Sequence, residues 1–127
     1  MGFADAVKAF FSNYVKFDGR SARSEYWWPQ LFMAVVNYVV ILPIMLLVSE
    51  GFGSILSTLF SLAVIIPAIA VSIRRLHDTD RSGWWLLLMF LPIIGWIALI
   101  VFFATKGTAG SNRFGPDPLG SDAAVFN

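Results

Sequence analysis

The stretch WWLLLMFLPIIGWIALIVFFA, residues 84–104, decides the class of fold, because its 21 residues include no charged side chain. The hydrocarbon core of a bilayer is about 30 Å thick and a helix rises about 1.5 Å per residue, so about 20 apolar residues are needed to cross it. A soluble domain of this size rarely buries an apolar helix that long. We therefore expect this segment to lie in a membrane.

Two further stretches, residues 27–48 and 54–73, are long enough to cross a bilayer and also lack charged residues. Of the 127 residues, 57% are hydrophobic and 13% are charged, and the mean hydropathy of +0.73 excludes an ordinary soluble domain. The expected fold is an all-α, polytopic membrane helical bundle of three spans. Its parts are a basic N-terminal segment (1–25), the transmembrane region (26–105) and a polar, Gly/Pro-rich tail (106–127).

The third stretch contains a proline and a glycine near its centre, in LPIIG at residues 91–95. Two forms are open: a continuous span, or a broken segment that turns back as a re-entrant hairpin. Each half of a broken segment has about ten residues, which is too short to cross a bilayer and favours the continuous span. The distribution of positive charge favours the broken form instead.

Lysine and arginine near the ends of spans stay in the cytoplasm, so the cations place the N-terminus there. Seven of them precede the first span or separate the second from the third, namely Lys8, Lys16, Arg20, Arg23, Arg74, Arg75 and Arg81. A continuous third span exports Lys106 and Arg113, whereas the broken form keeps all nine cations inside. The first and third stretches also begin alike, with RSEYWW at 23–28 and RSGWW at 81–85, so we expect both starts at the same interface.

An amphipathic helix is expected before the first span. Its apolar residues recur at helical spacing, and they are Phe3, Ala6, Val7, Phe10, Phe11 and Tyr14. Asp5 and Lys8 lie mainly on the opposite side. Two placements are open: the apolar side lies flat in the membrane interface, or it packs onto the spans of the protein itself.

Polar residues gather in three clusters. They are FDGRSARSEYWW at 17–28, RRLHDTDRSGWW at 74–85, and KGT at 106–108 together with NRFGPDP at 112–118. Arginine pairs with carboxylates and lipid phosphates in bidentate fashion, so the clusters predict an interfacial network of ion pairs and hydrogen bonds. Its candidate members are Arg20, Arg23, Glu25, Arg74, Arg75, His77, Asp78, Arg81, Asn112, Arg113 and Asp117. Metal or proton-relay chemistry at His77 is the weaker interpretation, because a metal ordinarily needs three or four ligands. No catalytic residue, cofactor site or metal site is assigned.

Together the three clusters resemble the bacterial inner-membrane family known as domain of unknown function 805, the YhaH-like proteins. That family shows a GR-x-x-R-x-E-Y-W segment, an RRLHD-x-x-(R or K)-S-G-W segment and an N-R-(F or Y)-G-x-(D or N)-P tail. The resemblance covers residues from about 17 to 118 and implies a small multi-span protein of the bacterial cytoplasmic membrane, with no activity attached.

The tail motif bears on the form of the third segment. If it meets the other two clusters in space, the tail must be cytoplasmic, which favours the broken form of the third segment. The alternative is that residues 115–118, GPDP, form a rigid turn that ends the ordered chain, with the residues after 120 disordered.

Within the spans, Asn37 is the strongest candidate for a hydrogen bond between helices. Pro67 and Pro92 lie at a similar depth, and each proline frees the carbonyl one turn back, on Ala63 and Leu88. These groups are candidates for a small polar slot open to the cytoplasm; ordinary kinks, satisfied by neighbouring groups, are the alternative.

We expect a non-enzymatic subunit that self-associates or binds a membrane-protein partner, because short spans bury little surface alone and Gly53, Ser57 and Ser61 form a stripe of small residues. The alternative is a small-solute or ion transporter or channel formed by an oligomer, and an interfacial enzyme ranks third. The bilayer and anionic phospholipid headgroups are the expected contacts. A net charge of +1 argues against nucleic acid, and the absence of cysteine excludes thiolate chemistry.

Overall fold

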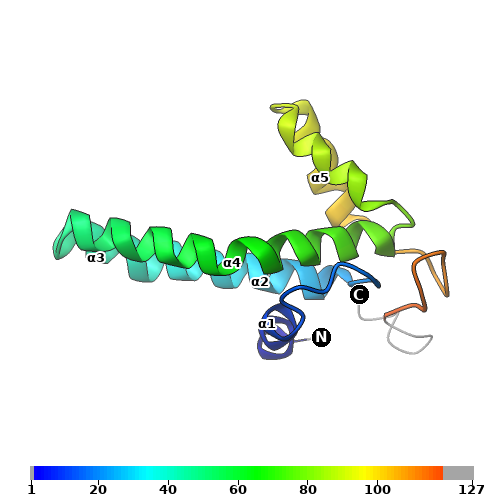
Figure 1. The fold of residues 1–127 in the computed structure, drawn as a ribbon, viewed down its shortest axis with the longest axis horizontal. Coiled ribbons are helices and arrows are strands. Elements are labelled where there is room, and N and C mark those ends of the chain that lie inside the picture. The colour runs from blue at the N-terminus through cyan, green and yellow to red at the C-terminus, as the bar shows by residue number, and fades with distance from the viewer. Residues whose placement is uncertain (1, 119–127) are drawn as a thin grey trace.

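The computed structural model describes residues 2–118, and its framework is a hairpin of two long helical rods (Figure 1). The first rod is continuous over 25 residues and consists of α2 (Arg23–Val35), the π-helix η1 (Val36–Ile41) and α3 (Leu42–Leu47). The second rod is α4 (Glu50–Asp78), with 29 residues. Both are long and apolar enough to cross a bilayer, and many of their large apolar side chains are exposed, as in lipid-facing helices. The expected all-α membrane bundle is confirmed.

The two rods approach closely at the turn that joins them. The Ser49 hydroxyl accepts a hydrogen bond from the Phe52 N–H (3.2 Å) and so caps the first turn of α4. A Cβ on Gly53 would lie 2.6 Å from the Cβ of Met45 in α3, so only glycine fits there. The stripe of small residues therefore begins with a residue that the protein's own first rod covers.

The π-helix in the first rod lies just before Pro43, which has no N–H to donate. The Leu42 N–H donates to the Asn37 carbonyl, five residues earlier, which is the π-helical pattern. The Asn37 side-chain amide donates to the Met33 carbonyl (2.9 Å) in the same rod. Asn37 is thus used within one rod rather than between the two.

The third apolar stretch has the broken form, and the continuous span that its length favoured is not formed. Its first arm is the 3-10 helix η2 (Gly83–Phe90), its second is α5 (Ile94–Ala104), and the turn between them has Ile93 at a φ of +67°. At rises of about 2.0 and 1.5 Å per residue, both arms are about 16 Å long, roughly half the thickness of the hydrocarbon core. The chain therefore turns back to the end of the bundle at which η2 begins.

Contacts between the two arms explain why the chain turns here. A Cβ on Gly95 would lie 1.8 Å from the Leu88 carbonyl oxygen, so the arms meet at their backbones. The Trp96 indole N–H donates to the Met89 carbonyl (2.7 Å), and the Gly95 N–H donates to the Leu91 carbonyl (3.0 Å). The Leu88 carbonyl, which Pro92 leaves without its helical donor, accepts from the Leu91 N–H instead (3.0 Å).

The N-terminal helix α1 (Phe3–Ser12) crosses the two rods on the side away from η2 and α5 in Figure 1. Ala6 and Phe10 are fully buried, and Phe3 and Phe11 meet aromatic rings of α2 edge-on. Of the two placements left open by the sequence, the structure has the apolar side packed on the protein's own rods. The core lies where α1, α2, α4 and α5 meet, and its members are Phe10, Tyr26, Val64, Val71, Leu76, Leu99 and Phe103.

Tyr14, just after α1, satisfies a carbonyl that a proline leaves free. Because Pro67 has no N–H, the Ala63 carbonyl lacks its donor within α4. The Tyr14 hydroxyl donates to this carbonyl at 2.7 Å. The kink alternative therefore holds at Pro67. The disorder expected after residue 120 lies outside the described residues.

Candidate functional site

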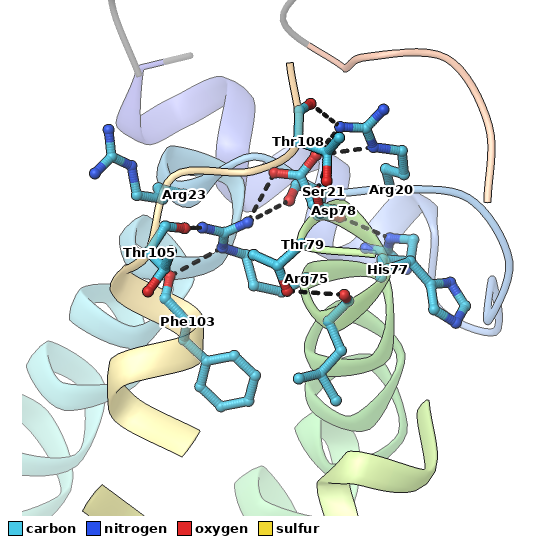
Figure 2. A network of polar contacts seen from close by, with 12 residues as sticks. Arg20, Ser21, Arg23, Arg75, His77, Asp78, Thr79, Phe103, Thr105 and Thr108 are labelled. Atoms are coloured by element: carbon cyan, nitrogen blue, oxygen red, sulfur yellow. Dashed lines mark hydrogen bonds and ion pairs between the residues drawn. The ribbon is translucent and has the colours of Figure 1, made fainter. Parts of the chain in front are cut away.

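The three polar clusters meet at the end of the bundle where α2 begins, α4 ends and the tail follows α5 (Figure 2). The tail reaches the other two clusters because the third segment turns back. The Ser21 N–H donates to the Arg74 carbonyl (3.0 Å) and the Thr108 N–H donates to the Asp78 carbonyl (2.7 Å), so backbone bonds join all three segments.

Asp78 is the centre of the cluster, and two arginines hold its carboxylate from two sides (Figure 2). The Arg20 Nε donates to Oδ1 at 3.0 Å, and the Arg75 Nη1 donates to Oδ2 at 2.7 Å. The side chains of Arg20, Asp78 and Arg75 are 1%, 2% and 0% exposed. Each carboxylate oxygen therefore has its own guanidinium, and the pairing is shielded from water.

Arg20 also holds the tail. Its Nη1 donates to the carbonyls of Gly110 (2.6 Å) and Gly115 (3.3 Å), and its Nη2 donates to those of Thr108 (2.5 Å) and Asp78 (3.4 Å). With the bond from Nε, all five N–H groups of the guanidinium have acceptors. The planar fork of arginine makes this possible, and a lysine ammonium has only three donors.

Arg75 binds the C-terminal end of α5 in a similar way. Its Nε donates to the Phe103 carbonyl (2.9 Å), and its Nη2 donates to the Thr105 carbonyl. The Phe103 carbonyl also accepts from the Trp27 indole (3.2 Å), and the Ala104 carbonyl accepts from Arg23 Nη1 (3.3 Å). Cationic donors at a helix C-terminus satisfy its free carbonyls and stabilise the helix dipole.

Arg74 is the third buried arginine, and it fixes the segment between α1 and α2. It donates from Nε to the Ser21 hydroxyl (3.0 Å) and from Nη1 to the Lys16 carbonyl (2.7 Å). Its Nη2 lies 3.7 Å from the Glu25 carboxylate and has no hydrogen-bond partner among the described residues. The buried Ser24 hydroxyl likewise has no partner in this part of the chain.

His77 lies at the edge of the cluster. Its Nδ1 is 2.9 Å from the Gly19 carbonyl, and its ring stacks on Phe114 with a centroid distance of 3.9 Å. The Asn112 side chain donates to the His77 carbonyl (2.9 Å), which attaches the tail to the end of α4. Over residues 2–118 there is no group of three His, Cys, Asp or Glu side chains that could hold a metal ion.

The remaining candidates form the outer part of the site. Arg81 lies over the ring of Phe102 at 4.1 Å, beside the end of α5. Arg113 pairs with Asp80 at 3.3 Å, and both side chains are about half exposed. The Asp117 carboxylate accepts from the Gly110 N–H (3.1 Å) and closes the tail loop. Since Arg23 and Arg81 both reach the end of α5, the two similar starts lie at the same end of the bundle.

Sequence reasoning missed two residues of this site. Ser21 is fully buried and bonds to both Arg74 and Arg75. Gly107 passes so close to Asp78 that a Cβ there would lie 2.0 Å from Oδ2. A serine between two arginines and a glycine just after an apolar segment were the available signals, and neither identifies its partner.

The chain resembles known proteins over most of its length. The family model described as "Protein of unknown function (DUF805)" matches residues 14–116. The inner membrane protein YhaI of Escherichia coli (strain K12) is 52% identical over 106 residues, which is 84% of this chain and 88% of YhaI. The inner membrane protein YhaH of the same strain is 48% identical over 108 residues, which is 84% of this chain and 89% of YhaH. No solved structure is detectably similar. The chain is therefore a membrane protein that belongs to the DUF805 family.

Proposed function

We propose that this chain is a non-enzymatic, multi-pass subunit of the bacterial cytoplasmic membrane that self-associates through its re-entrant hairpin. In this proposal the two rods cross the bilayer, the hairpin enters and leaves on one side, and the arginine cluster lies on the cytoplasmic face. The observation that carries the proposal is the exposed turn at the tip of the hairpin.

The charges support the cytoplasmic placement of both the N-terminus and the tail. Because the third segment turns back, Lys106 and Arg113 lie at the same end of the bundle as the seven other cations. Residues 48–49, which join the rods at the far end, carry no lysine or arginine. Because positively charged segments near span ends are retained in the cytoplasm, this arrangement supports a cytoplasmic location for all nine cations.

A reporter fusion after Asn127 tests this topology. Fused alkaline phosphatase should be inactive and fused green fluorescent protein should fluoresce, because the first folds only outside the cytoplasmic membrane and the second only inside. Fusions truncated after Ser49 should give the opposite pattern. An active phosphatase on the full-length chain contradicts the proposed re-entrant hairpin.

The hydrogen bonds made by the buried charged groups support a non-enzymatic role. The carboxylate of Asp78 and the guanidinium groups of Arg20 and Arg75 are directed at one another and at backbone carbonyls. A group that acts on a substrate has to present atoms to it. These three side chains instead hold the protein's own segments together.

The turn at the hairpin tip supports self-association. Leu91 and Ile93 are 55% and 65% exposed, and the N–H of Ile93 has no hydrogen-bond partner among the described residues. Irregular backbone occurs at membrane depth only where protein or water covers it, because an unpaired N–H in hydrocarbon costs several kcal/mol. A second copy of the chain, related by a two-fold axis, is the simplest cover.

Disulfide cross-linking in native membranes tests the association, and the chain has no cysteine of its own to interfere. Leu91→Cys should form a cross-linked dimer under oxidation, since two hairpin tips would face each other. Leu62→Cys, at a similarly exposed position of α4, is the matched control and should stay monomeric. Equal cross-linking of both variants, or none of either, contradicts the proposed interface.

The transporter alternative gains no support from the groups that suggested it. Asn37 donates within its own rod, Tyr14 occupies the Ala63 carbonyl, and the Leu91 N–H occupies the Leu88 carbonyl. Each of these groups is therefore already hydrogen-bonded within the protein. We therefore advance no second function.

A further inference from the structure

The molecule changes in width along the two rods. Near the turn that joins them, over residues 2–118, the rods lie side by side alone, whereas α1 and the re-entrant hairpin lie beside the other half (Figure 1). Phe3 of α1 meets Trp28, and Phe11 meets Phe32, in the first half of the 25-residue first rod. The N-terminal helix therefore widens only the half of the molecule that includes the polar cluster.

The re-entrant hairpin, η2 with α5, widens the same half. It leaves α4 at Gly83, where a Cβ would lie 3.1 Å from the Ile73 Cγ2, and it returns at Phe103, whose carbonyl accepts from Arg75 (2.9 Å). Each arm is about 16 Å long, whereas the 29 residues of α4 extend over about 43 Å. The hairpin therefore ends less than halfway along the rods.

Both α1 and the hairpin displace lipid rather than fill space between the rods. The hairpin leans away from α4, and its side chains Trp84, Phe90 and Ile94 are strongly exposed. On the opposite side of the rods, Phe3 and Phe11 of α1 are also exposed. Acyl chains have to surround these surfaces in a bilayer, so each element adds to the area that the protein occupies in its leaflet.

The difference in area between the two halves is large. A helix with its side chains is about 10 Å wide, so the two rods alone occupy roughly 160 Å² in the plane of the membrane. The other half adds two helical arms, and α1, with 10 residues, lies across the rods over roughly 15 Å by 10 Å. The wide half therefore occupies about three times the area of the narrow half.

The orientation advanced under the proposed function puts the wide half in the cytoplasmic leaflet, and the inference rests on it. A protein with a larger cross-section in one leaflet expands that leaflet relative to the other, and bending of the bilayer relieves the difference. Amphipathic helices that insert into one leaflet respond to curvature in the same way. We infer that the chain is a wedge that prefers strongly curved bilayers in which the cytoplasmic leaflet is convex.

Single-vesicle fluorescence of the full-length chain tests the inference. A fluorophore is attached at Ser111→Cys, in the exposed tail, because the chain has no cysteine of its own. The protein is reconstituted into phosphatidylethanolamine and phosphatidylglycerol vesicles of about 50 to 400 nm in diameter, a range over which curvature-sensitive helices can be compared. A quencher that cannot cross the membrane separates copies with the tail outside from copies with the tail inside.

The two orientations should respond to curvature with opposite sign. Copies with the tail outside have the wide half in the convex leaflet, so their number per membrane area should rise severalfold from the largest to the smallest vesicles. Copies with the tail inside should become less dense over the same range. The same dependence in both orientations, or none in either, overturns the inference.

Deletion of residues 2–12 removes α1, which supplies about half of the excess area of the wide half. The logarithm of the enrichment should fall to about half of its native value, in proportion to this area. If the shortened chain does not reconstitute, the double variant Phe3→Ala, Phe11→Ala reduces the volume of α1 and should weaken enrichment in the same direction.

The matched control replaces the exposed charges of α1 without changing its volume, by Asp5→Asn with Lys8→Gln. Its enrichment should equal that of the native chain, because the wedge depends on width and not on charge. Equal losses in this variant and in the deletion variant overturn the inference. The vesicle assay reads orientation directly, whereas the reporter fusions read it in cells, so the wedge and the proposed topology can fail separately.

Discussion

Asp78→Ala should lower the free energy of unfolding by about 3–5 kcal/mol, because it leaves two buried guanidinium groups without their shared counter-charge. Arg20 and Arg75 are almost completely buried on either side of this carboxylate. Neither arginine can reach water without displacing the tail or the end of α5, to which they donate hydrogen bonds. The loss is measured by denaturant titration in detergent micelles, followed by circular dichroism.

Asp80→Ala is the matched control, two residues away on the same connection. Asp80 pairs with Arg113, but both side chains are about half exposed, and exposed ion pairs contribute about 0–1 kcal/mol. We expect Asp80→Ala to change the free energy of unfolding only slightly and Asp78→Ala to lower it strongly. Comparable losses of unfolding free energy in the two variants contradict the central role assigned to the Asp78 carboxylate.

Sequence reasoning reached the class of fold and the positions of the two rods because both depend on residue type alone. It placed the ends less well, since the rods extend to Arg23–Leu47 and Glu50–Asp78. A bilayer requires about 20 apolar residues per span, and the stretches 27–48 and 54–73 satisfy this whatever their partners. The same holds for the carbonyl freed by Pro67, since the missing N–H is a property of proline. Which group would satisfy it depends on tertiary structure, and nothing in the sequence near Tyr14 indicates Ala63.

The form of the third segment depends on contacts that local sequence does not reveal. Its length favours a continuous span and its charges favour the hairpin, so the two arguments oppose each other. The structure adds the fit of Gly95 against the Leu88 carbonyl and the bond from Trp96 to Met89. Each contact joins residues seven apart, and this spacing serves a straight helix face as well as a turn.

The sequence identified most residues of the polar site, but it did not indicate which groups are hydrogen-bonded to each other. Every arginine in the clusters was a candidate for a carboxylate partner, yet most guanidinium N–H groups donate to backbone carbonyls instead. Carbonyls belong to every residue, so the sequence carries no mark of those that end up near an arginine. Gly107 illustrates the point, because its only function here is to leave room for Asp78.

Gly95→Ala should separate the two arms of the hairpin and destabilise the protein by about 3 kcal/mol or more, the upper part of the range for overpacking. The added Cβ would lie 1.8 Å from the Leu88 carbonyl oxygen. Because the obstacle is backbone, no change of rotamer relieves it, and α5 has to move. Movement of α5 takes the Phe103 carbonyl away from Arg75, so the effect should extend to the polar cluster.

Gly51→Ala is the control, because a Cβ there meets only the Ser49 hydroxyl, at 4.0 Å. Alanine has the higher helix propensity, so this variant should be as stable as the native chain or up to about 1 kcal/mol more stable. Amide hydrogen exchange distinguishes the two: Gly95→Ala should accelerate exchange in residues 94–104 and in the tail at 107–115, whereas Gly51→Ala should leave both protected. Unchanged protection of residues 94–104 in Gly95→Ala would mean that the backbone contact does not hold the two arms together. The turn between η2 and α5 would then have to be stabilised by other contacts.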